Sequence, residues 1–151
     1  MSRKLRLGVI GAGLKAAEYA ASWARMPEIE FVALADTIPS SRKRLIDVCV
    51  AAGAAAPKSF DDYREMLASC RDELDIVYVS TPHAFHGEQA TAVAEAGLDL
   101  FLEKPMVTTV AEAKRLIAAQ KKGGDHCNRF PRRSIAAGDR YAQTGACRRV
   151  R

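Results

Sequence analysis

Short runs of apolar residues recur along the chain at intervals that suit a sheet interleaved with helices. Val, Ile, Phe and Tyr are frequent in these runs, and strict alternation with polar residues is weak, which is typical of strands covered on both faces. We therefore predict buried β-strands. They fall at residues 5–10, 29–35, 74–80 and 98–102, with a short additional strand near 57–60.

Helical periodicity fills the segments between the predicted strands. Two of these helices end at a glycine, Gly53 and Gly97, and a third begins at Asp61 or Asp62, either of which is a good helix cap. The predicted helices span residues 14–26, 40–53, 61–69, 86–97 and 109–122. Because strands that alternate with helices form right-handed crossovers, we predict an α/β fold. Its doubly wound parallel sheet has the strand order 3-2-1-4-5.

A glycine-rich turn joins the first predicted strand to the first helix. Its sequence, GVIGAGLKA, carries the pattern G-x-G-x-x-A at Gly11, Gly13 and Ala16. The first glycine allows a tight turn, the second lets the backbone approach a pyrophosphate, and the third small residue lets helix and strand pack closely. Exposed amides at the helix N-terminus then bind the anion. A tight turn without a ligand is the alternative. The candidate cofactor-binding residues of this turn are Gly11, Ala12, Gly13, Leu14, Lys15 and Ala16.

Asp36 ends the second predicted strand, about 20 residues after the glycine turn. A carboxylate at this place accepts hydrogen bonds from an adenosine ribose and repels a 2′-phosphate, so it favours NAD over NADP. An aspartate that only caps the following turn is the alternative. Arg42, Lys43 and Arg44 follow soon after and would tolerate a 2′-phosphate, which keeps NADP possible. A solvated helix face is the simpler interpretation of these three residues.

A second candidate site follows the fourth strand in the segment STPHAFHGE. Ser80, Thr81 and Pro82 come directly after this strand, at the carboxyl end of the sheet, where open α/β folds bind ligands. His86 falls at the predicted start of the next helix. At such a place a histidine that is only a polar surface residue is the alternative to a ligand contact.

A third candidate is the segment LFLEKPM, in which an apolar run ends in Glu103, Lys104 and Pro105. A solvated lysine at a strand end is the simple interpretation. A lysine beside a substrate hydroxyl is the functional one, because an ammonium group can stabilise a developing alkoxide or relay its proton.

Taken in order, GVIGAG, ALAD, VYVSTPHAFHGEQATAVAEAG and LFLEKPM resemble the Gfo/Idh/MocA oxidoreductases, over about residues 4–121. The resemblance implies a Rossmann-type fold and a nicotinamide cofactor, NAD or possibly NADP. It implies that Ser80, Thr81, Pro82 and His86 line the cofactor. It also implies that Lys104 is catalytic beside the nicotinamide and the substrate hydroxyl.

Within the same motif, the resemblance implies that Glu103 supports Lys104 and also belongs to the cofactor site. Pro105 would fix the turn through a cis bond. His83 departs from the asparagine often found at its position in the family, so its cofactor contact is left open.

Composition narrows the classes of protein. The chain is 48% hydrophobic and 27% charged, as expected for a soluble globular domain, and no apolar run approaches the roughly 20 residues that span a bilayer. The apolar stretch at the start breaks at glycines, so we expect no signal peptide and a cytoplasmic protein. The cysteines stand far apart without metal-type spacing, which favours free thiols and no metal site. They are Cys49, Cys70, Cys127 and Cys147.

Charge separates the last residues from the rest. Residues 123–151 hold seven arginines and two aspartates, which account for the net charge of +5, because the 16 basic and 16 acidic residues before them balance. We therefore expect an NAD(P)-binding domain at residues 1–122. Residues 123–151 would be an Arg-rich tail, a truncated or frameshifted start of a substrate domain. An arginine arm that binds nucleic acid is the alternative, and scattered arginines with few aromatics disfavour it.

Members of the resembled family continue into a second, α+β domain that supplies most substrate contacts and the subunit interface. We expect that domain to be missing from this chain. The resemblance implies a sugar or polyol substrate, no nucleic-acid or membrane partner, and relatives that are often homo-oligomers. A dinucleotide-binding module without catalysis, or an inactive remnant, stays the alternative to an oxidoreductase.

Overall fold

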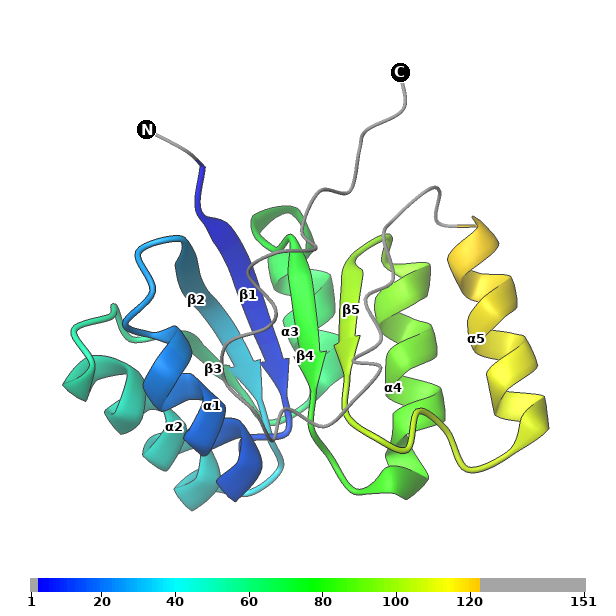
Figure 1. Ribbon diagram of the computed structural model, residues 1–151, viewed down its shortest axis with the longest axis horizontal. Helices are drawn as coiled ribbons and strands as arrows, with labels where there is room; N and C mark the ends of the chain where they lie inside the picture. Colours follow the sequence, from blue (N-terminus) through cyan, green and yellow to red (C-terminus); the bar gives the residue numbers. More distant parts are fainter. Residues whose placement is uncertain (1–2, 123–151) are drawn as a thin grey trace, which may run out of the picture.

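The computed structural model describes residues 3–122, which form a five-stranded parallel sheet between two layers of helices (Figure 1). The strand order is β3-β2-β1-β4-β5, which confirms the predicted topology. The strands are β1 (Leu5–Ile10), β2 (Ile29–Ala35), β3 (Lys58–Phe60), β4 (Ile76–Val79) and β5 (Asp99–Leu102).

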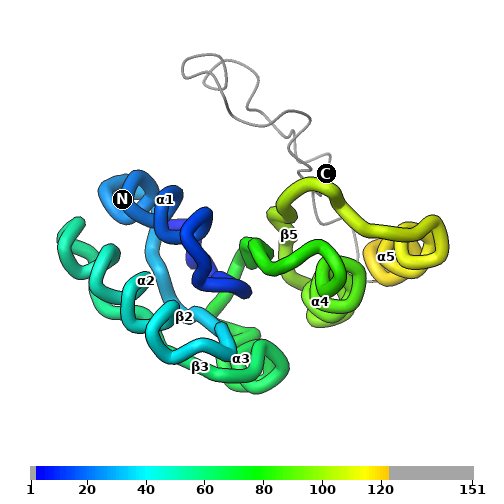
Figure 2. Tube along the Cα trace, turned by 90° about the horizontal axis from the view of Figure 1, so that it is seen from below, coloured from blue at the N-terminus to red at the C-terminus, as the bar shows by residue number. Residues whose placement is uncertain are grey.

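The helices are α1 (Leu14–Trp23), α2 (Pro39–Ala51), α3 (Tyr63–Cys70), α4 (His83–Glu95) and α5 (Val110–Lys122), with a short 3-10 turn at Arg71–Glu73. Helices α1 and α2 cover one face of the sheet, α3 and α4 cover the other, and α5 lies beside α4 (Figure 2). Each face therefore has a core of its own. Strand residues with side chains on both faces explain why the apolar runs lack strict alternation.

The two cores use alternate residues of the same strands. Val77 and Val79 of β4 pack with α3, α4 and α5, whereas Tyr78 between them packs with α1 and α2. From β1 the chain runs through α1 to β2 and through α2 to β3 on one side of β1, and it then crosses back through α3 to β4 on the other side. Open α/β sheets bind ligands where the strand order reverses in this way. In this fold that place is the carboxyl end of β1 and β4.

Several predicted boundaries are wrong by a few residues. Helix α4 begins at His83 and not at His86, so His86 lies a full turn inside the helix. Helix α1 ends at Trp23, short of the predicted 26. The strand predicted at 74–80 is shorter because the 3-10 turn precedes it. Of the two caps proposed for α3, Asp62 is the one that accepts the amide hydrogen of Arg64, at 2.7 Å.

The remaining predictions concern the tail, the cysteines and membrane-spanning segments. The predicted tail at 123–151, with Cys127 and Cys147, lies outside the described residues. Within the described part of the chain, Cys49 and Cys70 are buried free thiols, as predicted. No helix in this part is long and apolar enough to cross a membrane.

Candidate functional site

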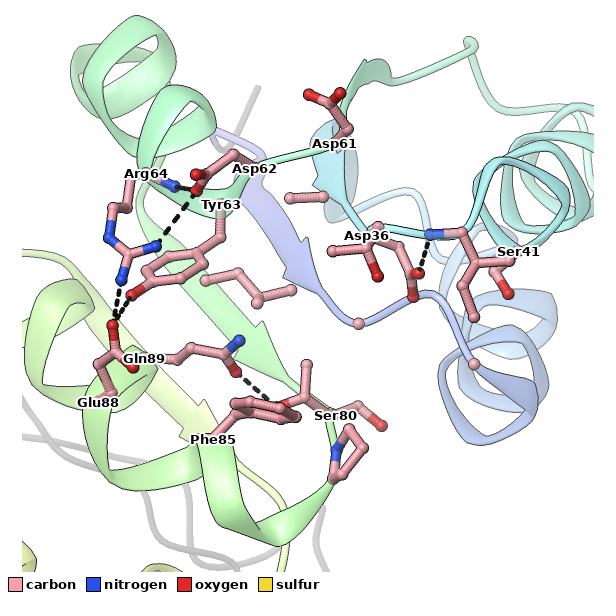
Figure 3. Close-up of a pocket in the computed structure, with 18 residues that line it drawn as sticks. Asp36, Ser41, Asp61, Asp62, Tyr63, Arg64, Ser80, Phe85, Glu88 and Gln89 are labelled. Atoms are coloured by element: carbon pink, nitrogen blue, oxygen red, sulfur yellow. Dashed lines mark hydrogen bonds and ion pairs between the residues drawn. The ribbon is translucent and has the colours of Figure 1, made fainter.

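A cleft of about 550 Å³ opens at the carboxyl edge of the sheet (Figure 3). Its lining comes from the loops after β1, β2, β3 and β4 and from the first turns of α2, α3 and α4. In Figure 3, Asp36 and Ser41 lie on one side, and Tyr63, Arg64 and Glu88 lie on the other. This volume falls within the range of small-molecule and cofactor sites.

The glycine turn forms one wall of this cleft. Gly11 has a φ of +91°, and a Cβ on it would lie 2.7 Å from both the Ser80 carbonyl oxygen and the Thr81 Cγ2. Only glycine fits there, because the conformation is left-handed and the neighbouring loop is in contact. The amide of Gly11 donates to the Ala35 carbonyl at 2.8 Å, which ties the turn to the end of β2.

Gly13 is a glycine for a different reason. It is the N-cap of α1 with a φ of −66°, and as a glycine it has no side chain that could cap the helix. A Cβ on Gly13 would meet no protein atom within 4 Å. The helix N-terminus therefore presents its amides to open space, which is the arrangement that binds phosphate groups. Behind it, Ala16 is buried against the sheet, as the pattern predicted.

Asp36 is held at the edge of the cleft by two backbone amides. Its Oδ2 accepts from Ala12 N at 2.7 Å, and its Oδ1 accepts from Ile38 N at 2.8 Å. The second bond is the turn cap that the sequence left open as an alternative. Each carboxylate oxygen has a further lone pair, so the cap and a ribose contact are compatible.

The basic residues after Asp36 divide into two groups. Lys43 pairs with Asp47 on the exposed face of α2, as a solvated face predicts. Arg42 and Arg44 turn back to the main chain instead: Arg42 Nη1 donates to the Asp36 carbonyl at 2.5 Å, and Arg44 Nη2 donates to the Ala12 carbonyl at 3.4 Å. Lys43 and Arg44 are exposed, as a solvated face predicts, whereas Arg42 is half-buried.

The loop after β4 forms the opposite wall. Ser80 N donates to the Ile10 carbonyl at 2.8 Å, which holds this loop next to the glycine turn. Thr81 Oγ1 donates to Gln89 Oε1 at 2.5 Å, so α4 fixes the same loop from the other side. Phe85, on the first turn of α4, is 51% exposed and lines the cleft with its ring.

An ion cluster closes the far end of the cleft. Arg64 of α3 pairs with Glu88 of α4, and Tyr63 Oη donates to the same Glu88 carboxylate at 2.9 Å. Burial, together with this carboxylate, raises the pKa of Tyr63 to about 12, so the phenol keeps its proton near neutral pH. The whole cleft lining contains four carboxylates, Asp36, Asp61, Asp62 and Glu88, against one arginine.

The segment that carries Lys104 lies outside the cleft lining. The Lys104–Pro105 peptide bond is cis, as the resemblance implied. Lys104 is exposed, and its amide donates to Glu103 Oε2 at 3.3 Å. Tyr78 Oη donates to Glu103 Oε1 at 2.8 Å, and burial raises the pKa of this tyrosine. Glu103 is therefore fixed by the core, while Lys104 is free to meet a ligand.

His86 has the least expected position. It is completely buried, with Nδ1 at 2.8 Å from the Pro105 carbonyl oxygen and Nε2 at 2.8 Å from the Thr81 carbonyl oxygen. This burial excludes the alternative of a polar surface residue, and α4 begins one turn before the predicted helix start. His86 joins the Thr81 loop to the Lys104 turn and does not itself line the cleft.

The structure brings together about half of the candidates found in the sequence. Those that line the cleft are Gly11, Gly13, Asp36, Ser80, Thr81 and Pro82. Those outside its lining are Ala12, Leu14, Lys15, Ala16, His86, Glu103 and Lys104. Lining residues that the sequence reasoning missed are Ile10, Ala35, Thr37, Ile38, Ser41, Asp61, Asp62, Tyr63, Arg64, Phe85, Glu88 and Gln89. Most of the missed residues follow a strand or open a helix at this edge, so the predicted topology was the signal for them.

Comparison with known proteins gives a family match over most of the chain. Residues 5–128 match the model of the Gfo/Idh/MocA oxidoreductase family, described as having an NAD-binding Rossmann fold. A glycosyl hydrolase family 109 protein from Shewanella woodyi is 29% identical over 127 residues, which cover 82% of this chain and 27% of that protein. The chain thus spans about a quarter of the length of the curated relatives it matches.

Two solved structures are likewise similar to most of this chain over about a third of their own length. The WlbA dehydrogenase from Bordetella pertussis, in complex with NADH and UDP-GlcNAcA, is 29% identical with a TM-score of 0.69, covering 85% of this chain and 36% of that one. KijD10, a 3-ketoreductase from Actinomadura kijaniata in complex with NADP and TDP-benzene, is 28% identical with a TM-score of 0.68, covering 81% and 35%. The similarity therefore includes relatives crystallised with each of the two nicotinamide cofactors.

Proposed function

The chain belongs to the Gfo/Idh/MocA oxidoreductase family, and we propose that it is the nucleotide-binding half of a dehydrogenase that acts on a sugar or cyclitol hydroxyl. The observation that carries this proposal is the cleft at the carboxyl ends of β1 and β4, with Gly13, Asp36 and Thr81 on its walls. Ligands of open α/β sheets bind at this place. In our proposal residues 1–122 form the cofactor domain.

The residues of the cleft fit NAD. The pyrophosphate would lie on the open amides at Gly13, and the adenosine ribose would bond to the carboxylate of Asp36. The same carboxylate would repel a 2′-phosphate on that ribose, so we propose NAD as the preferred cofactor. Arg42 and Arg44 lie near the same end of the cleft and would reduce that preference.

As the alcohol is oxidised, the bound nicotinamide would accept the hydride from carbon, and Lys104 would relay the hydroxyl proton to water. As an alcohol is oxidised its hydroxyl proton must leave, and an ammonium group beside it stabilises the developing alkoxide. Lys104 is exposed, and no carboxylate in the described part of the chain forms an ion pair with it, whereas Glu103 beside it is anchored by Tyr78. This difference supports Glu103 as the support and Lys104 as the catalytic residue.

The substrate class rests on the relatives. The Bordetella pertussis relative was crystallised with UDP-GlcNAcA, which supports a sugar substrate for the complete protein. The Shewanella woodyi relative is named a glycosyl hydrolase, which favours glycoside cleavage as a second candidate reaction. Because the chain spans about a third or less of these relatives, a second domain on the same or another chain would supply the substrate contacts and any subunit interface.

A binding module without catalysis is the other candidate. An NADH titration together with a turnover assay distinguishes it from a dehydrogenase. We expect saturable binding of NADH to the full chain, followed by NADH fluorescence, and no binding to Gly13→Val, whose side chain occupies the pyrophosphate space. Turnover with a panel of polyols and nucleotide sugars would support the dehydrogenase. Binding without turnover would support the module, and the absence of saturable binding would contradict both.

A further inference from the structure

We propose that His86 is a positioning residue that, as a doubly protonated imidazolium, fastens the Thr81 loop to the turn that carries Lys104. Each ring nitrogen faces a backbone carbonyl oxygen at 2.8 Å, from Pro105 on the Nδ1 side and from Thr81 on the Nε2 side. The ring is fully buried, so water does not compete for either bond. The functional meaning of the link rests on the proposed function, because Thr81 would line the cofactor and Lys104 would meet the substrate.

The protonation state follows from the partners. A carbonyl oxygen only accepts hydrogen bonds, and a neutral imidazole has a single N–H to donate. A neutral His86 would therefore point the lone pair of one nitrogen at a carbonyl oxygen 2.8 Å away, which is repulsive, and would leave that oxygen without this donor. With a proton on each nitrogen, both contacts become charge-assisted hydrogen bonds.

The groups packed around His86 show what compensates the positive charge of its imidazolium. On α4 itself, the ring of His83 packs edge-on against His86, with centroids 5.4 Å apart. From α5, the carboxylate of Glu112 packs against Gly87, the next residue, and accepts from Thr108 and Thr109. From the turn, Lys104 adds a second positive charge. Among the described residues no carboxylate forms an ion pair with His86, so the two carbonyl dipoles are its direct partners.

The link places both functional segments on one rigid support. Helix α4 holds Thr81 twice, through the carbonyl to His86 and through the hydroxyl to Gln89, one turn further along. It holds the Lys104 turn through His86 and the Pro105 carbonyl. A displacement of this turn is therefore coupled to the loop that would line the cofactor. Precise positioning of catalytic groups depends on such supporting contacts.

The first test reads the ring directly and needs no cofactor. The chain contains three histidines, and in ¹⁵N-labelled full-length protein the two-bond ¹H–¹⁵N spectrum distinguishes each neutral tautomer from the imidazolium. At a pH of about 7.5, where an exposed histidine is about nine-tenths neutral, we expect both nitrogens of His86 to be protonated. The His86 signals are assigned by their loss in His86→Gln, and those of its neighbour by loss in His83→Gln. An unprotonated nitrogen in His86 at this pH would overturn the proposal.

The second test separates the two hydrogen bonds. The side-chain amide nitrogen of asparagine lies near the Nδ1 position and that of glutamine near the Nε2 position, so His86→Asn keeps the Pro105 bond and His86→Gln keeps the Thr81 bond. We expect NADH affinity to fall about fivefold to tenfold in His86→Asn and to stay within about threefold in His86→Gln. Thermal melts check that both variants fold. Equal effects on NADH affinity would refute separate roles for the two nitrogens.

The two tests also separate this inference from the proposed function. If the wild-type chain fails to bind NADH, the proposed function is wrong, and the spectrum still decides the protonation state of His86. If NADH binds and His86 is neutral, the proposed function stands and the imidazolium link is wrong.

Discussion

At the scale of single residues, Gly11 and Gly13 are glycines of one motif, but the physical reason for having glycine differs between the two positions. Gly11 combines a φ of +91° with a contact of 2.7 Å that any Cβ would make to the Ser80 carbonyl. Gly13 has an ordinary φ of −66° and open space around it. The fold itself requires the first glycine, whereas the second leaves room for a ligand.

Alanine substitutions at Gly11 and Gly13 should therefore differ in their effect on the free energy of unfolding. Gly11→Ala adds backbone strain and a clash with the neighbouring loop, so we expect the free energy of unfolding to fall by about 2–4 kcal/mol. Gly13→Ala should change it by no more than about 0.5 kcal/mol. Urea denaturation followed by circular dichroism measures both. A Gly11→Ala variant as stable as the wild type would mean that the turn accommodates a side chain.

Asp36 sets the expected cofactor preference. Asp36→Ala removes a carboxylate from the end of the cleft where Arg42 and Arg44 remain, so the repulsion of a 2′-phosphate should weaken. A charged hydrogen bond contributes about 1.5–3 kcal/mol, and we expect the ratio of NADH to NADPH affinity to fall about tenfold or more. Parallel titrations with the two cofactors measure the ratio. An unchanged ratio would count against the ribose contact.

At the scale of elements, Asp75 fastens the start of β4 to β1. Its carboxylate accepts from the backbone amide of Arg6 at 2.9 Å, from Arg6 Nε at 3.1 Å and Nη2 at 3.0 Å, and from Arg3. Hydrogen bonding by Arg6 is the main reason that the pKa of Asp75 is lowered. A lowered pKa means that the folded state prefers the charged carboxylate, so the bond contributes stability only where Asp75 is ionised.

The pH dependence has a definite sign. This contribution is fully present above the unfolded pKa of about 3.9 and is lost as pH falls through the lower folded pKa. We expect Asp75→Asn to lower the free energy of unfolding by about 1–2 kcal/mol at neutral pH, and the difference from wild type to shrink below about pH 4. Thermal melts across pH measure it. Asp72→Asn is the matched control, since that side chain is 96% exposed, and an equal loss there would contradict the role of Asp75.

The elements also show what sequence reasoning can and cannot locate. The strands were predictable because a buried parallel strand must be an apolar run. The start of α4 was not, because its N-cap is Pro82, which makes no side-chain capping bond. The usual cap signals were therefore missing. The error of one turn hid the burial of His86, whose two partners come from loops that are close only in the folded chain.

At the scale of the whole molecule, the cleft depends on segments distant in sequence. The pattern of alternating strands and helices was sufficient to predict the sheet order and the edge at which ligands bind. It could not predict the cluster of Tyr63, Arg64 and Glu88, because periodicity shows which face of a helix is buried but not which partner it meets. Of the motif glycines, Gly11 is required by the fold, whereas Gly13 leaves space that a ligand would fill.

A ligand that bridges the cleft should stabilise the entire domain. The glycine turn follows β1 and the Thr81 loop follows β4, so cofactor bound between them would contact both halves of the sheet. Binding to the folded state alone adds about 2.7 kcal/mol to the free energy of unfolding when the ligand is at 100 times its Kd. We expect NADH to raise the Tm of the wild-type chain accordingly.

Two variants test whether Lys104 contacts the cofactor or the substrate. Gly13→Val should lose the increase in Tm, because its side chain fills the pyrophosphate space. Lys104→Ala should keep it, since Lys104 is exposed and lies outside the cleft lining, while any turnover of a sugar or cyclitol disappears. If Lys104→Ala also loses the increase, Lys104 holds the cofactor and the assignment of its ammonium group to the substrate is wrong. Because the melt needs no substrate, this test can be made on the chain as it stands.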